Sequence, residues 1–308
     1  MATAPRDPEQ AEALGAPAAG TLPAATRMGS VHLTVADLER SLAYYEHSIG
    51  LRVHRRDGDT AALGAGAEDL LVLVERSGAR PASGYCGLYH FALLLPERTD
   101  LACWLAHGAR ERVPLVGLSD HFVSEAIYLS DPDGHGIEIY WDRPRETWEG
   151  KVAQRMTTLP LDTASLLGEL PDPERSVFHG LPVATSMGHV HLCVADVQAT
   201  IAFYRDQLGF ALMAALDSHA AFLSAGGYHH HLGANTWESA GAGQPPTGST
   251  SLRYATVLLP SRVELEALLE RLSAAGVKYT SEPALGGSLV RDPSGNSLLL
   301  APAVTDSA

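Results

Sequence analysis

Apolar and polar positions alternate through residues 30–35, which is the pattern of a strand with one buried face. Asp37 is placed to cap a helix over 38–49, and Gly50 follows as a typical residue after a helix C-terminus. Three short strands are expected next, near residues 51–55, 61–63 and 70–75. The first part of the chain therefore predicts a unit with the element order βαβββ.

The same kind of unit is expected three more times, so we number four units along the chain. Unit 2 begins with a strand over 88–95, and Asp131-Pro-Asp-Gly134 is a strong turn signal between its last two strands. Its other expected elements are a helix over 99–107 and strands near 122–128 and 136–140. Unit 3 covers 187–237 and unit 4 covers 252–301, where the helix over 262–275 has leucines along one face.

Length and repetition predict two domains in an α+β chain. At 308 residues the chain is long enough for two domains with sizeable cores, and the repeated units agree with that number. Residues 1–27 are rich in Ala and Pro and offer no face to bury, so a disordered tail is expected. A linker is expected over 143–186, with one short helix over 163–170. The expected domains and C-terminal tail are 28–142, 187–301 and 302–308.

Three sequence motifs recur between the two halves of the chain. Residues 28–37, 88–96 and 131–140 match, in this order, residues 187–196, 252–260 and 292–301. The strand positions that align are Ser30, His90 and Glu138 in the first half and His189, Tyr254 and Leu299 in the second. The first half thus supplies one imidazole and one carboxylate, and the second half supplies one further imidazole. Only the two halves together contain a set of two imidazoles and one carboxylate.

His90, Glu138 and His189 have the residue types of a metal site. Two neutral imidazoles and one carboxylate on one face leave three positions of an octahedral Fe(II) open, as in the facial triad of non-haem iron enzymes. Two other histidines, His191 and His32, are also candidates for the third metal ligand. Each lies two residues beyond an aligned position, and therefore on the same face of its strand. Whether His189, His191 or His32 is the third ligand stays open.

Charge and cysteine content argue against several classes of protein. A formal net charge of −14 argues against nucleic acid as a partner, since its binding needs a basic face. Cys86, Cys103 and Cys193 show no Cys-x-x-Cys spacing, so a reducing cytosol fits better than a disulfide framework or a thiolate zinc site. The sequence shows no signal-peptide pattern and no apolar run of membrane-spanning length, which favours a cytoplasmic protein.

Several motifs together carry a family resemblance. They are Gly188-His-Val-His-Leu192, Phe203-Tyr204, Leu208-Gly209-Phe210, Asp131-Pro-Asp-Gly134 and Ile137-Glu138-Ile139. In combination they resemble the vicinal-oxygen-chelate superfamily, which comprises glyoxalases, bleomycin resistance proteins and extradiol dioxygenases. Residues 87–96, 124–128, 138–140 and 226–233 are similar to two-domain catechol 2,3-dioxygenases of the bacillus type. The resemblance covers roughly residues 28–301.

The resemblance implies two glyoxalase-like domains, whose four βαβββ modules form two cup-shaped, mostly antiparallel sheet barrels. It also implies cleavage of a catechol-type ring beside its two hydroxyls by Fe(II) and O₂, with Mn(II) as the alternative metal. The best-known extradiol pattern has all three ligands in the C-terminal domain, where this chain has Tyr254 and Leu299. We therefore expect unit 2 to pair with unit 3 around the metal, and unit 1 with unit 4. The rival is sequential pairing, with His32, His90 and Glu138 as ligands.

Further histidines are candidates for contact with the substrate. Strand alternation would send His230 to one face and its neighbours His229 and His231 to the other, and a histidine in the cup can move a proton from the catechol. We expect catalytic roles for His230 and His191, and surface positions for the neighbours of His230. His121 is expected either to cover the cavity or to cap its own loop.

Two other functions stay open from the sequence. A glyoxalase-like isomerase or lyase would use Ni or Zn and usually a second carboxylate, but His230 stands at the corresponding strand of unit 3. A non-catalytic protein that sequesters an aromatic ligand or drug would not need two histidines and a glutamate on one face. The sequence also leaves open the ring substituents, the choice of iron or manganese, and whether the chain forms a homo-oligomer.

Overall fold

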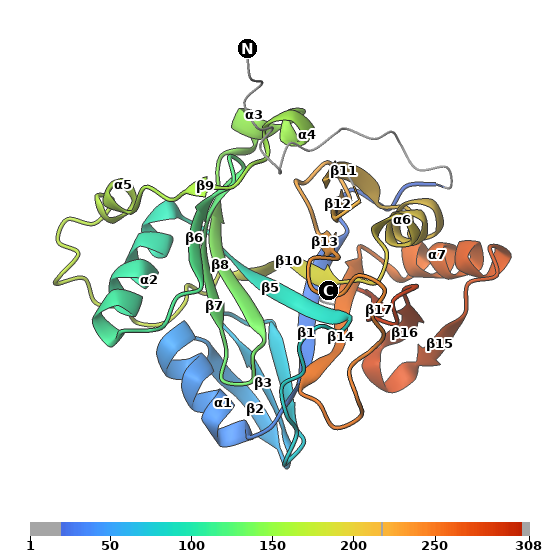
Figure 1. Ribbon diagram of the computed structural model, residues 1–308, viewed down its shortest axis with the longest axis horizontal. Helices are drawn as coiled ribbons and strands as arrows, with labels where there is room; N and C mark the ends of the chain where they lie inside the picture. The colour runs from blue at the N-terminus through green and yellow to red at the C-terminus, as the bar shows by residue number, and fades with distance from the viewer. Residues whose placement is uncertain (1–19, 217, 304–308) are drawn as a thin grey trace.

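Two mixed β-sheets form the centre of the computed structural model, which describes residues 20–216 and 218–303 (Figure 1). The eight-stranded sheet has the order β15 (Tyr279–Glu282), β16 (Gly287–Arg291), β17 (Ser297–Pro302), β14 (Ser251–Leu259), β1 (Arg27–Val35), β4 (Leu71–Glu75), β3 (Thr60–Gly64), β2 (Arg52–Asp57). The nine-stranded sheet has the order β11 (Ala211–Leu216), β12 (Ala220–Ser224), β13 (Leu232–Asn235), β10 (Ser186–Cys193), β5 (Gly87–Leu95), β8 (Gly136–Asp142), β7 (Ser124–Ser130), β6 (Gly117–Asp120), β9 (Leu159–Pro160). Each sheet contains two parallel strand pairs, and its other pairs are antiparallel.

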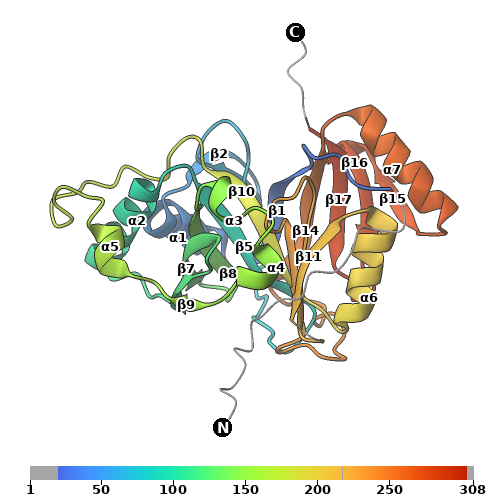
Figure 2. The same cartoon turned by 90° about the horizontal axis from the view of Figure 1, so that it is seen from above.

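The longer helices lie outside the sheets, with α1 and α2 at one side of the molecule and α6 and α7 at the other (Figures 1 and 2). The helices are α1 (Leu38–Tyr44), α2 (Arg98–Glu111), α3 (Arg145–Trp148), α4 (Val152–Arg155), α5 (Thr163–Leu167), α6 (Val197–Ile201), α7 (Arg262–Ala274), with π-helical η1 (Tyr45–Ile49) and η2 (Ala202–Leu208) and the 3₁₀ turn η3 (Pro283–Leu285). The predicted helix over 38–49 is confirmed as α1 and η1, because Asp37 caps it and Gly50 ends it at a φ of 94°. No helix among the described residues is long and apolar enough to cross a bilayer.

The sheets are built from crossed pairs of units. Strand β10 of unit 3 pairs antiparallel with β5 of unit 2, whereas β1 of unit 1 pairs antiparallel with β14 of unit 4. The expected crossed pairing is therefore confirmed, and the rival sequential pairing is wrong. Each expected domain, 28–142 and 187–301, contributes strands to both sheets.

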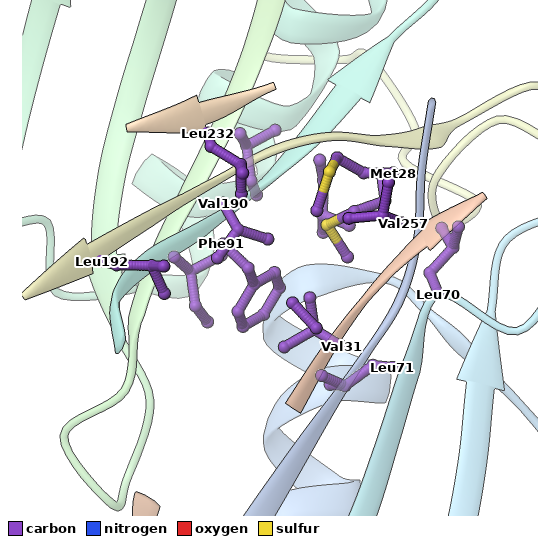
Figure 3. Close-up of a cluster of buried hydrophobic side chains, with 14 of the residues drawn as sticks. Met28, Val31, Leu70, Leu71, Phe91, Val190, Leu192, Leu232 and Val257 are labelled. Carbon is purple, nitrogen blue, oxygen red and sulfur yellow. The ribbon is translucent and has the colours of Figure 1, made fainter. Parts of the chain in front are cut away.

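The core between the sheets decides which face of β5 and β10 is turned outward. Met28 and Val31 from β1 and Val257 from β14 lie in one cluster with Phe91 from β5 and Val190 from β10 (Figure 3). All five side chains are at most 1% exposed. Because side chains alternate along a strand, burial of Phe91 and Val190 turns the residues beside them toward the opposite face. A slip of one residue would put histidines into this core, so the register is strongly fixed.

A buried tyrosine–aspartate pair recurs in the two halves of the chain. The Tyr45 hydroxyl donates to Asp131 Oδ2 at 2.8 Å, and the Tyr204 hydroxyl donates to Asp292 Oδ2 at 3.0 Å. Both aspartates also accept backbone N–H groups from their own turn, two and four residues further on. These pairs join unit 1 to unit 2 and unit 3 to unit 4, whereas the sheets join the units crosswise.

Parts of the expected tail and linker are packed. Leu22 is 6% exposed and belongs to the main core, and its backbone N–H donates to the Gly209 carbonyl at 2.9 Å. The expectation of an unpacked tail up to residue 27 is therefore wrong around Leu22, while residues 1–19 and 304–308 lie outside the described residues. In the expected linker, Trp148 is 2% exposed and α3, α4, β9 and α5 form. The short helix expected over 163–170 is present as α5.

Replacing either buried tyrosine by phenylalanine should destabilise the fold. Tyr45→Phe and Tyr204→Phe each remove a donor from a buried carboxylate, which should lower the free energy of unfolding by about 1–3 kcal/mol in urea titrations. Tyr44→Phe is the matched control, because its hydroxyl donates to the Ser130 carbonyl in a more exposed place. Equal stabilities for Tyr45→Phe and Tyr44→Phe would show that the bond to Asp131 contributes nothing.

Two truncations test the packing of the segment before β1. Deleting residues 1–26 takes Leu22 out of the core, and loss of a buried leucine side chain costs about 2–5 kcal/mol. We expect this variant to melt clearly below the variant that lacks only residues 1–19, as measured by calorimetry. Identical melting temperatures would show that the packing of Leu22 is dispensable.

Candidate metal centre

His90, Glu138 and His189 converge on one point of the nine-stranded sheet. Nε2 of His90 and Nε2 of His189 each lie 3.0 Å from Oε2 of Glu138, and the two nitrogens are 3.3 Å apart. Two ligands at right angles, each about 2.1 Å from a metal, would be separated by about 3 Å. The three atoms thus have the spacing of adjacent ligands, and within the described residues they form the one such cluster of His, Cys, Asp or Glu.

Strand register explains why residues so far apart in sequence meet. His189 on β10 pairs with Ala92 on β5, and Ala92 pairs on its other side with Glu138 on β8. The small side chain of Ala92 leaves the space across which His189 and Glu138 reach each other. His90 lies two residues earlier than Ala92 on the same strand, and therefore on the same face.

Two β-bulges lie beside the cluster. Met187 pairs with Leu93 but His189 pairs with Ala92, which leaves Gly188 as an extra residue in β10. A Cβ at Gly188 would lie 1.7 Å from the Tyr140 hydroxyl, so only glycine fits there. The second bulge is at Tyr89 of β5. Bulges re-aim neighbouring side chains, and they are common near active sites.

The protonation states of the cluster suit a metal ion. Burial alone would raise the pKa of Glu138, but its contacts with the imidazoles of His189 and His90 hold that pKa well below the usual range. Burial lowers the pKa of His189, against the opposing effect of Glu138. A carboxylate beside a neutral imidazole is the state that metal binding requires. Nδ1 of His189 is buried without a hydrogen-bond partner among the described residues, so Nε2 is the nitrogen that contacts the other two groups. The donor set therefore fits a divalent metal.

A cavity of about 580 Å³ opens onto the cluster. Its wall includes the three residues of the cluster and also His191 and His230. The side chains of Glu138 and His189 are at most 3% exposed, so the cavity is their access to small molecules.

His191 lies next to the cluster rather than within it. Its ring centroid is 5.0 Å from that of His90, and its Nε2 is buried without a hydrogen-bond partner among the described residues. Burial holds the pKa of His191 well below the usual range, so the ring is neutral. The ring packs on Gly233, where a Cβ would lie 2.7 Å from Nδ1. His191 thus lines the cavity, while its Nε2 is shielded from solvent.

His230 is held by a chain of hydrogen bonds that ends at Asp142. Nδ1 of His230 lies 2.8 Å from Nδ1 of His229, and Nε2 of His229 lies 2.8 Å from Oδ1 of Asp142. The Tyr228 hydroxyl donates to Oδ2 of Asp142 at 2.7 Å, and the Tyr140 hydroxyl lies 2.7 Å from the Tyr228 hydroxyl. A carboxylate only accepts, so a neutral His229 donates from Nε2 and accepts at Nδ1. His230 then carries its proton on Nδ1, and its Nε2 is unprotonated.

The histidine triplet differs from the expected strand. Residues 229–231 form an irregular bend just before β13, so simple alternation does not apply. His229 is 0% exposed and His231 is 8% exposed, which makes the expected surface positions wrong. His231 accepts the backbone N–H of Ala225 at Nδ1 and contacts the Ser224 hydroxyl. His230 lines the cavity, as expected.

His121 lines the cavity and also ties its loop to the segment after α4. Its Nδ1 lies 2.8 Å from the Thr157 carbonyl, and its Nε2 lies 2.7 Å from the Tyr128 hydroxyl. Since a carbonyl only accepts, a neutral His121 donates from Nδ1 and accepts the Tyr128 proton at Nε2. His121 therefore lies at the cavity, and its hydrogen bonds go to other segments rather than to its own loop.

The equivalent positions of the eight-stranded sheet hold no such cluster among the described residues. His32 stacks on Tyr254 with ring centroids 4.0 Å apart, and its Nε2 lies 3.0 Å from the Ser30 hydroxyl. Burial, foremost, lowers the pKa of His32 to about 4. Tyr254 and Leu299 belong to one small apolar cluster. His32 lies in the other sheet from His90 and Glu138, and so it is not their partner.

Sequence reasoning missed several residues of this site. Asp142, Tyr228 and Tyr140 hold the histidine chain, and Met156 and Trp237 line the cavity. Met156 lies in the segment taken as a linker, where the sequence gives no functional signal. The run Tyr228-His-His-His231 is the one signal that pointed to this region.

Comparison with known proteins agrees with this arrangement. The sequence matches the Glyoxalase/Bleomycin resistance protein/Dioxygenase superfamily over residues 27–139 and 186–300. The chain belongs to this superfamily. A relative named catechol-2,3-dioxygenase, from Bacillus subtilis (strain 168), is 41% identical over 276 residues, which cover 87% of this chain and 94% of the relative. The chain is thus a homologue of that protein.

Two solved structures share the fold of this chain. A putative dioxygenase from Bacillus subtilis subsp. subtilis str. 168 has a TM-score of 0.61 at 14% identity, covering 92% of this chain and 86% of its own. Glyoxalase I from Zea mays has a TM-score of 0.54 at 18% identity, covering 90% of this chain and 92% of its own. At these identities the likeness concerns the α+β fold.

Substitutions in the cluster should separate it from the eight-stranded sheet. His90→Ala, Glu138→Ala and His189→Ala should each abolish stoichiometric binding of a divalent metal, because three ligands must reach one ion at about 2–2.2 Å. His32→Ala is the matched control and should keep the metal. The measurement is metal content after anaerobic loading, with circular dichroism to confirm folding.

Two outcomes of this series would be informative. Metal loss in His32→Ala but not in His189→Ala would contradict the site. If His191→Ala lost the metal and His189→Ala retained it, the third ligand would be His191 instead of His189.

Proposed function

We propose that this protein is an extradiol ring-cleaving dioxygenase that acts on a catechol-type aromatic with O₂ and Fe(II), with Mn(II) as the alternative metal. The observation that carries the proposal is the cluster of His90, Glu138 and His189 at the end of a cavity. Two imidazoles and one carboxylate leave positions for both an organic substrate and O₂. The 41% identity to a relative named catechol-2,3-dioxygenase supports the same reaction.

The metal, when bound, would hold the two adjacent oxygens of the catechol, lower the pKa of its hydroxyls and accept O₂. The chain's own residues then orient the ring and manage its protons. His191 lines the cavity beside His90, where its ring contacts the substrate. The apolar side chains of Leu216 and Phe222 line the cavity and limit water around the ring. Positioning of this kind supplies much of the rate enhancement when two reactants must meet.

His230 is the residue best placed to take a proton from the substrate. Opposite a neutral His229 its Nδ1 donates and its Nε2 is unprotonated, and burial, foremost, keeps the pKa of His230 well below the usual range. Asp142 fixes His229 from the other side, which holds the tautomer of His230. A neutral imidazole in this position accepts the catechol proton at Nε2 and returns it to the ring-opened product.

Two alternative functions fit the cavity less well. A glyoxalase-like isomerase usually has a second carboxylate on its metal, and the one other acidic residue among the described lining residues is Glu238. Glu238 is exposed and lies outside the metal cluster. A sequestering protein would gain nothing from burying Glu138 between two histidines.

We also propose a cytosolic location, which rests on the chemistry of the cysteines. Cys86, Cys103 and Cys193 are free thiols in the described structure. Burial, foremost, raises the pKa of Cys86 and raises that of Cys193 to about 12, so both stay protonated and unreactive. A protein with three free thiols suits a reducing compartment.

The proposed reaction can be tested on the full chain. Protein loaded anaerobically with Fe(II) and mixed with catechol and O₂ should consume equal amounts of both and form a yellow ring-opened product. Metal-loaded protein that binds catechols without consuming O₂ would contradict the dioxygenase and favour sequestration. Conversion of a hemithioacetal instead would favour the isomerase.

Replacing His230 should lower the rate of the chemical step without affecting the metal. His230→Gln removes the proton acceptor, and loss of a general base costs about 10²–10⁴-fold in kcat. Metal content should remain that of the unchanged protein, since His230 lies outside the cluster. The matched control is His32→Gln, which should keep full activity. Full activity in His230→Gln would show that another group takes the proton.

A further inference from the structure

The cavity is larger than one catechol ring requires. Its volume of about 580 Å³ lies in the range of sites that bind drug-sized ligands, roughly 300–1,000 Å³. A ring held at His90, Glu138 and His189 would occupy the inner end, where these side chains are at most 6% exposed. The remaining space lies toward solvent and can hold a part of the substrate beyond the ring.

Large aromatic side chains stand at the outer end of the cavity. Tyr85, Tyr89 and Trp237 line it and are 39%, 36% and 47% exposed. The ring centroids of Tyr89 and Trp237 are 5.3 Å apart, and Trp237 is 5.7 Å from His191. His191 in turn is 5.0 Å from His90, so a continuous path of rings leads from the metal cluster to the rim. Exposed aromatic clusters of this kind mark binding surfaces.

A β-bulge turns Tyr89 toward this cavity. His191 pairs with His90, but the next residue, Leu192, pairs with Leu88, which leaves Tyr89 as the extra residue. Both Tyr89 and His90 can therefore line the same cavity, although they are adjacent in sequence. The equivalent bulge of the eight-stranded sheet holds Arg253. The sheet with the metal cluster thus has an uncharged ring where the other sheet has a cation.

The charges of the cavity disfavour an anionic substituent. Among the described residues that line it, none is a lysine or an arginine. Its carboxylates are Glu138 in the cluster and Glu238 at the exposed rim. A substrate carboxylate would lose hydration without gaining a cationic partner, and it would meet Glu238.

We propose that the preferred substrate is a catechol with a bulky, uncharged aromatic substituent that packs against the Tyr89–Trp237 pair. The diol ring lies at the metal cluster, and the substituent extends past His191 to the rim. This inference rests on the proposed ring-cleaving function, and it names Tyr89 and Trp237 as the residues that determine specificity.

A substrate series on the Fe(II)-loaded full chain tests the inference. The series consists of catechol, 3- and 4-phenylcatechol, and the carboxylated 3,4-dihydroxyphenylacetate and 2,3-dihydroxybenzoate. At least one phenylcatechol should exceed catechol about tenfold in kcat/KM, mainly through a lower KM, and both carboxylated rings should fall below catechol. Calorimetric titration of the Zn(II)-loaded protein, which does not turn over, should give the same order of affinities.

Substitutions at the rim should change the selectivity. Tyr89→Ala and Trp237→Ala should each lower the kcat/KM ratio of phenylcatechol to catechol about tenfold. Tyr279→Ala is the matched control, because Tyr279 is also 36% exposed but lies on β15 of the other sheet. Its ratio should equal that of the unchanged protein.

The outcomes separate this inference from the proposed function. No cleavage of any diol by metal-loaded protein would contradict the proposed function itself. Cleavage of catechol with preference for the unsubstituted or carboxylated rings would overturn the inference and leave the function standing. A phenylcatechol preference that survives both rim substitutions would show that other residues hold the substituent.

Discussion

The antiparallel pairing of β10 with β5 is the constraint on which the site depends. Val190 and Phe91 are buried between the two sheets, so the alternation of side chains turns His189, His191 and His90 to the other face. The apolar core and the polar cluster are thus two faces of the same strand pair. A shift in the register between β5 and β10 would therefore disrupt both the apolar core and the histidine cluster.

The two sheets formed by the duplicated chain differ in their function, because only one of them holds the candidate metal ligands. One sheet keeps the imidazoles and the carboxylate, whereas the equivalent positions of the other are filled by a stacked His32–Tyr254 pair and by Leu299. The tyrosine–aspartate pairs connect consecutive units, and the sheets connect alternate ones. The eight-stranded sheet therefore acts as a scaffold, against which the back of β5 and β10 is packed.

Much of this arrangement could be predicted from the sequence, because its signals are local or repeated. Asp37, Gly50 and the aspartate turns marked element ends, and counting ligands across the repeat indicated that unit 2 pairs with unit 3. The bulges at Gly188 and Tyr89 could not be predicted, since a bulge depends on the partner strand rather than on its own residues. The same holds for Asp142: its link to His229 exists only once a strand end and a distant bend are brought together.

The errors have a common physical cause. Burial of Leu22, Trp148 and His229 comes from tertiary contacts that their local sequences do not announce. The composition of the Ala- and Pro-rich N-terminal segment and of the polar connection predicts solvent exposure. The first nevertheless buries Leu22, and the second buries Trp148 and several leucines. A run of histidines predicts a surface segment. His229 and His230 are nevertheless buried, because they are hydrogen-bonded to each other and His229 is hydrogen-bonded to Asp142.

We expect units 2 and 3 to share one metal ion and units 1 and 4 to bind none. Anomalous diffraction at the iron edge, from crystals of anaerobically loaded protein, can locate each bound iron. One iron peak per chain is expected, within about 2.3 Å of Nε2 of His90, Nε2 of His189 and the Glu138 carboxylate. A peak beside His32 and Tyr254, or two peaks of equal height in one chain, would contradict this expectation.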